Sequence, residues 1–472
     1  MLAPKKMSPW SLEYGPYMTD GKITHIVGRI GTATIVDEIS QQSHKLKQGS
    51  LVWIPKGSKA SFSSSKDFYT VYVEQCHGQS GFKTGFEPVA KKSLKPQLDS
   101  LVATFASENP ASLERHKRSQ NTLAGGNTRA VLHEEPFPLA IESGYGPYVV
   151  SVDKRKYLDL VSDYSAGLFG HSNAVIADAV SRAVSNGFNL GGVTKVEVEL
   201  GERIKQRFDG IEKIRFCNSG TEANTYALAT AMTFTGRKKI LVFDNGYHGG
   251  TLSFSSRGNP LNLPHDFVFG KYNNIEETRR LISSELAAII VEPMLAAGGQ
   301  IAATRDFLLF LREAANVTGA VLIFDEVVTS RLHVNGLQGF HNIKPDMTTL
   351  GKYLGGGLPF GAFGGRSDIM ALFDPSRQKL SHSGTFNNNA FTMYAALAAS
   401  DLVTEKEINR INKFGDTIRE EVATKIQEGF GKAPEQGNVD VEHCIVIGKT
   451  YLDGYVGWAV KYPPKDTDIR TP

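Results

Sequence analysis

The stretch PDMTTLGKYLGGGLPFGAFGGR, residues 345–366, places a single lysine, Lys352, directly after Gly351 and shortly before three consecutive glycines. The residues before the lysine are short and partly apolar, as expected for a strand that enters a loop. The glycines at 355–357 allow backbone angles that other residues resist. We therefore expect Lys352 at a strand-to-loop junction, where its amine could condense with an aldehyde. A solvated surface lysine is the simpler alternative.

Strands and helices alternate along residues 213–370, which is the pattern of a mainly parallel, doubly wound α/β sheet. Short apolar runs predict strands at residues 213–216, 238–243, 287–292 and 320–325. Helical spacing of apolar residues predicts helices at residues 98–108, 174–186, 193–208, 223–236 and 306–319. Gly319 is suited to close the last of these helices. The middle of the chain is therefore expected to form one large α/β domain.

Residues 21–74 contain short β-like runs broken by glycine, lysine and serine clusters, which predicts a small all-β barrel or sandwich. Within it GSLVWIPKG, residues 49–57, resembles the G-x5-P-x-G turn of cupins. Cupins that bind a metal carry an H-x-H pair and a later histidine, whereas Ala60 stands where that histidine would fall. We expect a metal-free cupin-like unit over residues 1–85, followed by a linker at 86–110.

The chain has 472 residues, 41% of them hydrophobic and 21% charged, and a formal charge of +3. At roughly 100–200 residues per domain, this length suggests two to four domains. The small net charge gives no electrostatic reason to expect a nucleic-acid or membrane partner. The cysteines Cys76, Cys217 and Cys444 are widely spaced, like free thiols in a reducing compartment. With no apolar run of about 18 residues and no signal-peptide core, the cytoplasm is the expected location.

Two candidate polar positions lie at the carboxyl ends of predicted strands. Ser219, Gly220 and Thr221 stand between a strand and a helix, and the free N–H groups of a helix start suit a phosphate. An ordinary serine cap is the alternative. Asp325 ends a very apolar strand, and ligands of open α/β sheets bind beyond such strand ends. A buried acid there needs a cationic partner, such as a protonated pyridine nitrogen, unless it only caps the next turn.

Two loops complete the candidate positions. Tyr247 lies in the glycine-flanked loop NGYHGGT, where its ring could stack on a planar group, although packing is the simpler role. Residues 382–392, HSGTFNNNAFT, form a polar loop that opens a helix and offers a second place for phosphate oxygens, or an ordinary cap. A loop lysine, a strand-end acid, an aromatic ring and a phosphate-binding helix start are the parts that a pyridoxal-phosphate site needs.

The motifs resemble those of the class III, fold type I aminotransferases, in the branch that holds the β-phenylalanine and other β-amino-acid aminotransferases and glutamate-1-semialdehyde aminomutase. In that family's order, over about residues 110–430, they are GGNTRAV, SAGLFGHS, FCNSGTEAN, GRKKILVF, GYHGG, VEPM, FDEVVTSRL, TTLGKYLGGG, FGAFGGR and HSGTFNNN. The resemblance implies an N-terminal segment at 111–170, a large cofactor-binding domain at 171–375 and a C-terminal α+β small domain at 376–472.

The resemblance also implies a role for each site residue. Lys352 would form the covalent link to pyridoxal 5'-phosphate and carry protons, Asp325 would keep the ring nitrogen protonated, and Arg129 would bind the substrate carboxylate. The other implied cofactor contacts are Ser219, Gly220 and Thr221 at the phosphate, Tyr247 and Val327 on the two ring faces, and Thr385 from the neighbouring subunit of a homodimer. Small-molecule amines and keto acids would be the substrates.

The resemblance fades after about Phe430, and Arg470 is the only arginine in the tail that follows. We do not expect it to serve as a second carboxylate-binding residue, so substrate choice stays open. The expected function is transfer of an amino group from a β-amino acid or related amine to a keto acid such as 2-oxoglutarate. One alternative is an aminomutase of the glutamate-1-semialdehyde type, which needs no external keto acid. The other is an inactive scaffold whose cupin-like unit binds a ligand.

Overall fold

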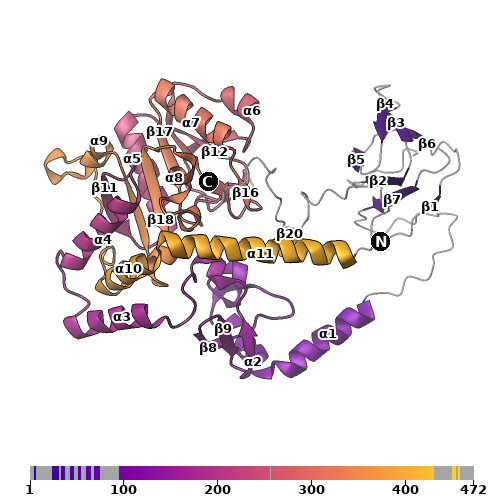
Figure 1. Cartoon of the computed structure of the whole chain (residues 1–472), viewed down its shortest axis with the longest axis horizontal. Helices are drawn as coiled ribbons and strands as arrows, with labels where there is room; N and C mark the ends of the chain where they lie inside the picture. Colours follow the sequence, from indigo (N-terminus) through magenta and orange to yellow (C-terminus); the bar gives the residue numbers. More distant parts are fainter. Residues whose placement is uncertain are drawn as a thin grey trace. The chain divides into compact units, whose positions relative to one another are not determined.

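The computed structural model of the chain contains two compact units, Met1–Gln97 and Leu98–Pro472 (Figure 1). The described residues are 5–6, 24–30, 33–37, 43–46, 51–54, 60–64, 69–74, 95–255, 257–429, 449–452 and 455–457. All of the candidate site residues belong to the larger unit. The fold of that unit therefore decides how they meet, and the narrower domain limits expected from the sequence stay predictions.

In its described residues the smaller unit forms two antiparallel sheets, which agrees with the β-structure expected from its sequence. The strand orders are β1-β7-β2-β5 and β4-β3-β6. The strands are β1 (Lys5–Lys6), β2 (Thr24–Ile30), β3 (Ala33–Asp37), β4 (Ser43–Leu46), β5 (Leu51–Ile54), β6 (Ala60–Ser64) and β7 (Tyr69–Glu74). The expected turn at Gly49, Pro55 and Gly57 lies outside the described residues, so the likeness to cupins stays a prediction.

The larger unit is built on a seven-stranded sheet of order β11-β19-β18-β17-β14-β12-β13. All neighbouring pairs from β18 to β13 are parallel, whereas β19 runs antiparallel to both of its neighbours. The strands are β11 (Lys213–Cys217), β12 (Lys239–Phe243), β13 (Asp266–Gly270), β14 (Leu286–Val291), β17 (Val321–Asp325), β18 (Met347–Gly351) and β19 (Gly361–Gly365). The predicted mainly parallel sheet is confirmed, with one reversed strand.

Helices cover both faces of this sheet because successive side chains of a strand point to opposite faces. In β12, Ile240 and Val242 pack in one cluster with helix α5 (Gly220–Thr235). The residue that lies between them, Leu241, packs on the other face with helix α7 (Arg305–Thr318). The same alternation continues in β14 and β17, where every residue is buried. Continuous apolar strands are expected of a parallel sheet that is enclosed on both faces.

Helix α3 (Ala174–Asn186) has the predicted bounds and begins after Asn173, whose side chain accepts the N–H groups of the first turn. Helix α4 (Lys195–Arg207) begins after Thr194 in the same way. Both contact helix α10 (Ala390–Leu402) (Figure 1). The other helices are α1 (Lys95–Glu108), α2 (Pro110–Gln120), α6 (Ile275–Arg279), α8 (Gly336–His341), α9 (Ser367–Met370) and α11 (Glu405–Gly429). Helix α1 lies within the linker predicted at residues 86–110 and occupies much of it.

Shorter strands complete the fold. An antiparallel meander is present as the sheet β10-β9-β8. The short strands are β8 (Ile141–Tyr145), β9 (Tyr148–Ser151), β10 (Lys156–Leu158), β15 (Met294–Leu295), β16 (Ile301–Ala302), β20 (Lys449–Leu452) and β21 (Tyr455–Gly457). Arg470 lies outside the described residues. Among the helices in the described part of the chain, none has the length and apolar character needed to cross a membrane.

A left-handed turn follows the meander. Residues 162–165 all have φ between 46° and 75°. That region costs residues with a side chain roughly 1–2 kcal/mol each. Asp159 stabilises the start of the turn because its Oδ1 accepts the N–H groups of Val161 and Ser162, both at 2.9 Å. Its Oδ2 contacts His171 Nε2 at 3.0 Å. Strained backbone that is held in this way is frequent at functional sites.

We predict that Ser165→Gly stabilises the protein. Ser165 has φ of 75°, and its buried hydroxyl has no hydrogen-bond partner within the described residues. Glycine removes both penalties but makes the unfolded chain more flexible, so the net gain should be about 0.5–1 kcal/mol. Thermal or urea unfolding of the purified protein would measure this gain.

The matched control is Ser181→Gly, which makes the same change inside helix α3. Ser181 has helical backbone, and its hydroxyl donates to the carbonyl of Ala177 at 2.9 Å. Glycine there should lower the free energy of unfolding by about 0.5–1 kcal/mol. If Ser165→Gly also destabilised the protein, the turn would not be strained as inferred.

Candidate active site

Several candidate residues meet at the carboxyl ends of neighbouring parallel strands. Asp325 ends β17, Lys352 directly follows β18, and Tyr247 lies in the loop after β12. Glu292 directly follows β14, which lies between β12 and β17. Ligands of open α/β sheets bind at this edge because loops leave a crevice beyond the strand ends. The sheet therefore gathers two acids, a lysine and an aromatic ring from distant parts of the sequence.

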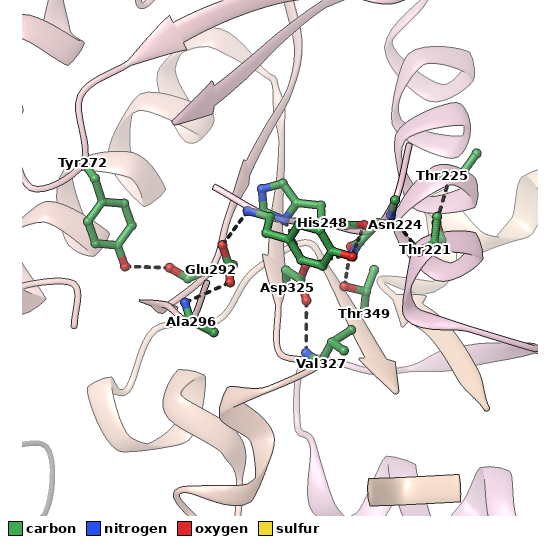
Figure 2. A network of polar contacts seen from close by, with 12 residues as sticks. Thr221, Asn224, Thr225, His248, Tyr272, Glu292, Ala296, Asp325, Val327 and Thr349 are labelled. Carbon is green, nitrogen blue, oxygen red and sulfur yellow. Dashed lines mark hydrogen bonds and ion pairs between the residues drawn. The ribbon is translucent and has the colours of Figure 1, made fainter. Parts of the chain in front are cut away.

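Asp325 is 4% exposed and lies at the centre of a hydrogen-bond network (Figure 2). Its Oδ2 accepts a hydrogen bond from Asn224 Nδ2 and contacts His248 Nδ1, both at 2.8 Å. Its Oδ1 accepts the N–H of Val327 at 3.0 Å. Asn224 is fixed in turn by Thr349, whose hydroxyl donates to Asn224 Oδ1 at 2.6 Å. These contacts satisfy the buried carboxylate and fix its position.

His248 is buried beside Asp325, and its carbonyl oxygen accepts a hydrogen bond from Asn224 Nδ2 at 3.0 Å. Burial opposes a positive charge on the imidazole. The hydrogen bond to Asp325 and the charge of that residue outweigh burial, and the pKa of His248 is raised above its ordinary value. When the imidazole is protonated, the two side chains form a buried ion pair.

Glu292 is the second buried acid at this edge, with 5% of its surface exposed. Its Oε2 accepts the N–H of Tyr247 at 2.9 Å, and its Oε1 accepts the N–H of Ala296 at 3.2 Å (Figure 2). Burial raises the pKa of Glu292 to about 7, with the charge of His248 opposing the rise and that of Asp325 adding to it. Glu292 therefore anchors the loop that carries Tyr247.

Lys352 follows β18 directly, as the sequence predicts, but its side chain is half-buried rather than solvated. Its φ of 51° lies in the left-handed region. Burial lowers the pKa of its amine. The charged groups that also act on this pKa, in decreasing order of strength, are Asp325, Asp163, Arg129 and Glu292. Asp325 and Lys352 lie at the same edge of the sheet because β17 and β18 are parallel neighbours.

The first turn of helix α5 offers backbone N–H donors. Ser219 caps the helix, since its hydroxyl accepts the N–H of Glu222 at 3.1 Å. Among the described residues, the N–H groups of Gly220 and Thr221 donate to no acceptor. Gly249 approaches the same turn so closely that a Cβ on it would lie 2.3 Å from Thr221 Oγ1. The cap and the anion site expected from the sequence are therefore compatible with each other.

Val327 and Tyr247 flank this turn and the strand ends. A Cβ on Gly220 would lie 2.9 Å from Val327 Cγ2, which places the valine against the start of α5. Tyr247 is 45% exposed, and burial raises the pKa of its phenol. The charge of Arg129 acts on the pKa of that phenol in the opposite direction. The Nη1 of Arg129 donates to Asp163 Oδ1 at 2.7 Å.

Thr385 is the predicted site residue that this single chain does not bring to the others. It is exposed in the loop before α10, and within the described residues no hydrogen bond joins it to another candidate. The loop itself is fixed, because Asn218 Nδ2 donates to Asn387 Oδ1 at 3.1 Å. The fold of the described residues therefore reveals no role for Thr385 within its own subunit.

Sequence reasoning missed four members of the site: Asn224, His248, Glu292 and Asp163. Glu292 and His248 had a usable signal, since Glu292 is the polar last residue of one predicted strand and His248 comes shortly after another. Asn224 had a weaker one, because asparagine is unfavourable inside a helix unless its amide has a partner. Asp163 had none, because no glycine marks the left-handed turn that carries it.

Comparison with known proteins gives the fold and the family. The pattern of the family Aminotransferase class-III matches residues 130–439. The β-phenylalanine transaminase of Variovorax paradoxus is 47% identical over 331 residues, which cover 69% of this chain and 76% of that protein. The crystal structure of a β-phenylalanine aminotransferase from Variovorax paradoxus matches with a TM-score of 0.68 and 45% identity, covering 70% of this chain and 77% of that one.

A transaminase structure with PLP bound matches with a TM-score of 0.65 and 31% identity, covering 68% of this chain and 80% of that one. The seven-stranded mixed sheet is thus part of a known architecture. The chain belongs to the class III aminotransferases, pyridoxal-phosphate-dependent enzymes of fold type I.

Proposed function

We propose that this class III aminotransferase moves an amino group from a β-amino acid or related amine to a keto acid such as 2-oxoglutarate. The observation that carries the proposal is the position of Lys352 directly after β18, the parallel neighbour of β17, which ends at the fixed carboxylate of Asp325. The 47% identity to a β-phenylalanine transaminase supports the choice of amine.

The strand-end residues fit pyridoxal phosphate. The first turn of α5 has free N–H groups for a phosphate, Asp325 offers a buried negative charge for a protonated ring nitrogen, and Lys352 offers an amine for the aldehyde. The residues that would hold the group are Ser219, Gly220, Thr221, Tyr247, Val327, Asp325 and Lys352. When bound, the cofactor supplies an electron-withdrawing ring that stabilises the negative charge left on a substrate carbon after its proton is removed.

The contacts of Asp325 leave it able to accept one more donor. Asn224 and His248 both contact Oδ2, whereas within the described residues Oδ1 accepts only the N–H of Val327. A carboxylate oxygen can accept two hydrogen bonds, so Oδ1 keeps a free lone pair. We assign this lone pair to a protonated ring nitrogen, because a charged donor satisfies a buried acid best.

Lys352 would bind the cofactor and move protons. Because burial lowers its pKa, more of its amine is neutral near pH 7 than in an exposed lysine, and a neutral amine can accept a proton from the substrate carbon. The backbone beside it is fixed, since the neighbouring Tyr353 is fully buried and its hydroxyl donates to Ser330 Oγ at 3.1 Å. The same amine can therefore return the proton at a second position without leaving the site.

We also propose a homodimer in which Thr385 of one subunit reaches the phosphate held by the other. Thr385 is exposed, and the next residue, Phe386, exposes 57% of its surface. Phe386 lines a cavity of about 410 Å³ together with apolar residues that include Val180 and Leu358. Exposed apolar surface of this kind suits a protein interface.

Arg129 would bind the substrate carboxylate. A cytoplasmic location stays an expectation from the sequence.

We predict that Lys352→Ala abolishes amino transfer. The variant lacks both the cofactor-binding amine and the proton carrier, so formation of glutamate from β-phenylalanine and 2-oxoglutarate should fall by at least about 10³-fold. A glutamate assay with purified protein measures this. Lys156→Ala is the control and should retain activity. Lys156 is exposed, and its amine lies 3.8 Å from the centre of the Tyr148 ring.

Two outcomes of the same assay would contradict the proposal. One is a wild-type protein that transfers no amino group from any member of a panel of amines. The other is conversion of a single amino-aldehyde substrate without an external keto acid, which would indicate an aminomutase instead.

The dimer proposal predicts complementation between two defective subunits. Thr385→Ala should weaken cofactor binding about tenfold, the effect of losing one hydrogen bond to a charged group. A mixed dimer of one Lys352→Ala subunit and one Thr385→Ala subunit has one site with both substitutions and one site with neither. Cofactor titration of this dimer should show one site of wild-type affinity. If that site were as weak as in Thr385→Ala dimers, Thr385 would act within its own subunit.

Glu292 should make stability depend on pH. Burial raises its pKa from 4.5 to about 7, so between these values the folded state binds more protons than the unfolded state, and stability falls as pH rises. Relative to Glu292→Gln, which does not titrate, the wild type should lose on the order of 3 kcal/mol across this window. Urea unfolding of both cofactor-free proteins at a series of pH values measures the difference. A difference that stays constant with pH would show that the carboxylate titrates normally.

A further inference from the structure

The arginine assigned to the substrate carboxylate already contacts a carboxylate of this chain. The Nη1 of Arg129 donates to Asp163 Oδ1 at 2.7 Å, and the two side chains are 48% and 52% exposed. Within the described residues, the other nitrogens of Arg129 make no hydrogen bond. Because a guanidinium can hold a carboxylate through two parallel hydrogen bonds, Asp163 uses only part of what Arg129 offers.

Asp163 also lies close to the reacting amine. Burial lowers the pKa of Lys352, and after Asp325 the charge of Asp163 is the strongest that opposes this shift. Arg129 acts on the same amine and also on the phenol of Tyr247. Under the proposed function, in which Arg129 binds the substrate carboxylate, the side chain of Asp163 already occupies one of the donors meant for that carboxylate.

The backbone holds Asp163 in this place. It belongs to the left-handed turn at residues 162–165, whose start is fixed by Asp159. The next residue, Tyr164, donates its hydroxyl to the carbonyl of Val131 at 3.1 Å. Val131 lies two positions after Arg129, so this hydrogen bond links the turn to the segment that carries Arg129. Strained backbone that is stabilised on several sides is more common at binding sites than elsewhere.

We propose that Asp163 is a built-in competitor of the substrate: its carboxylate occupies Arg129 until a substrate carboxylate takes its place. The inference rests on the proposed function, in which Arg129 binds that carboxylate. An exposed pair joined by one hydrogen bond is weak, so a substrate carboxylate that forms two bonds displaces it. Asp163 thereby sets the affinity of the site for carboxylates and keeps small inorganic anions away from Arg129.

The test is Asp163→Asn, which keeps the shape of the side chain, removes its charge and tolerates a positive φ. The KM for β-phenylalanine should fall about two- to fivefold, as expected for the loss of one exposed ion pair. The KM for 1-phenylethylamine, a similar amine without a carboxylate, should show no such fall. Glu142→Gln is the matched control, because Glu142 is 47% exposed and pairs with Lys154; it should leave both KM values unchanged.

Two more measurements isolate the competition. In an Arg129→Ala background, Asp163→Asn should no longer lower the KM for β-phenylalanine, because the residue for which the carboxylates compete is gone. Calorimetry on the cofactor-loaded protein should show that 3-phenylpropanoate, which has a carboxylate but no amine and cannot react, binds two- to fivefold more tightly to Asp163→Asn than to wild type.

The binding measurement keeps the two proposals separate. If the protein turned over no amine, the proposed function would fail, while the affinity for 3-phenylpropanoate would still decide the role of Asp163. Unchanged or weaker binding of 3-phenylpropanoate to Asp163→Asn would overturn the competitor role. An equal fall in the KM for 1-phenylethylamine would overturn it as well, because that amine has no carboxylate that could bind Arg129.

Discussion

The carboxylate of Asp325 must be satisfied without water, because it is buried at the end of the central strand of the sheet. A buried charge without partners is destabilising by several kcal/mol. Its partners come from helix α5, from the loop after β12 and from the turn after β17, through Asn224, His248 and Val327. Satisfying one acid therefore fixes the relative positions of three separate segments, and these same segments carry the helix start, the aromatic ring and the valine proposed to hold the cofactor.

Burial and charge act in opposite directions on the residues around this acid. Burial disfavours the charged form of Lys352, while Asp325, Asp163 and Glu292 favour it. For Glu292 burial prevails, and its pKa rises to about 7. A lysine whose pKa is lowered by burial accepts a substrate proton more readily than an exposed lysine does. The chemistry proposed for the site thus depends on how deeply each group is buried, and not only on which groups are present.

The sequence predicts the sheet better than it predicts the site. Apolar runs and helical spacing locate β14, β17, α3 and α7, because these elements are buried on defined faces, and Gly319 closes α7 with φ of 71° as expected. Strand β19 was not predicted, because its glycine-rich sequence GAFGG lacks the apolar run that marks the other strands. The contact between His248 and Asp325 joins residues 77 positions apart and depends on strand order. Lys352, Asp325 and Thr221 were found from local patterns, whereas Asp163 depends on a turn that no local pattern marks.

The close approach of Gly249 to Thr221 limits how the protein can change. A single methyl group on Gly249 would collide with Thr221, and its φ of 122° disfavours any side chain. A laboratory library that randomised this codon to find new amine substrates would fill with misfolded or cofactor-free variants.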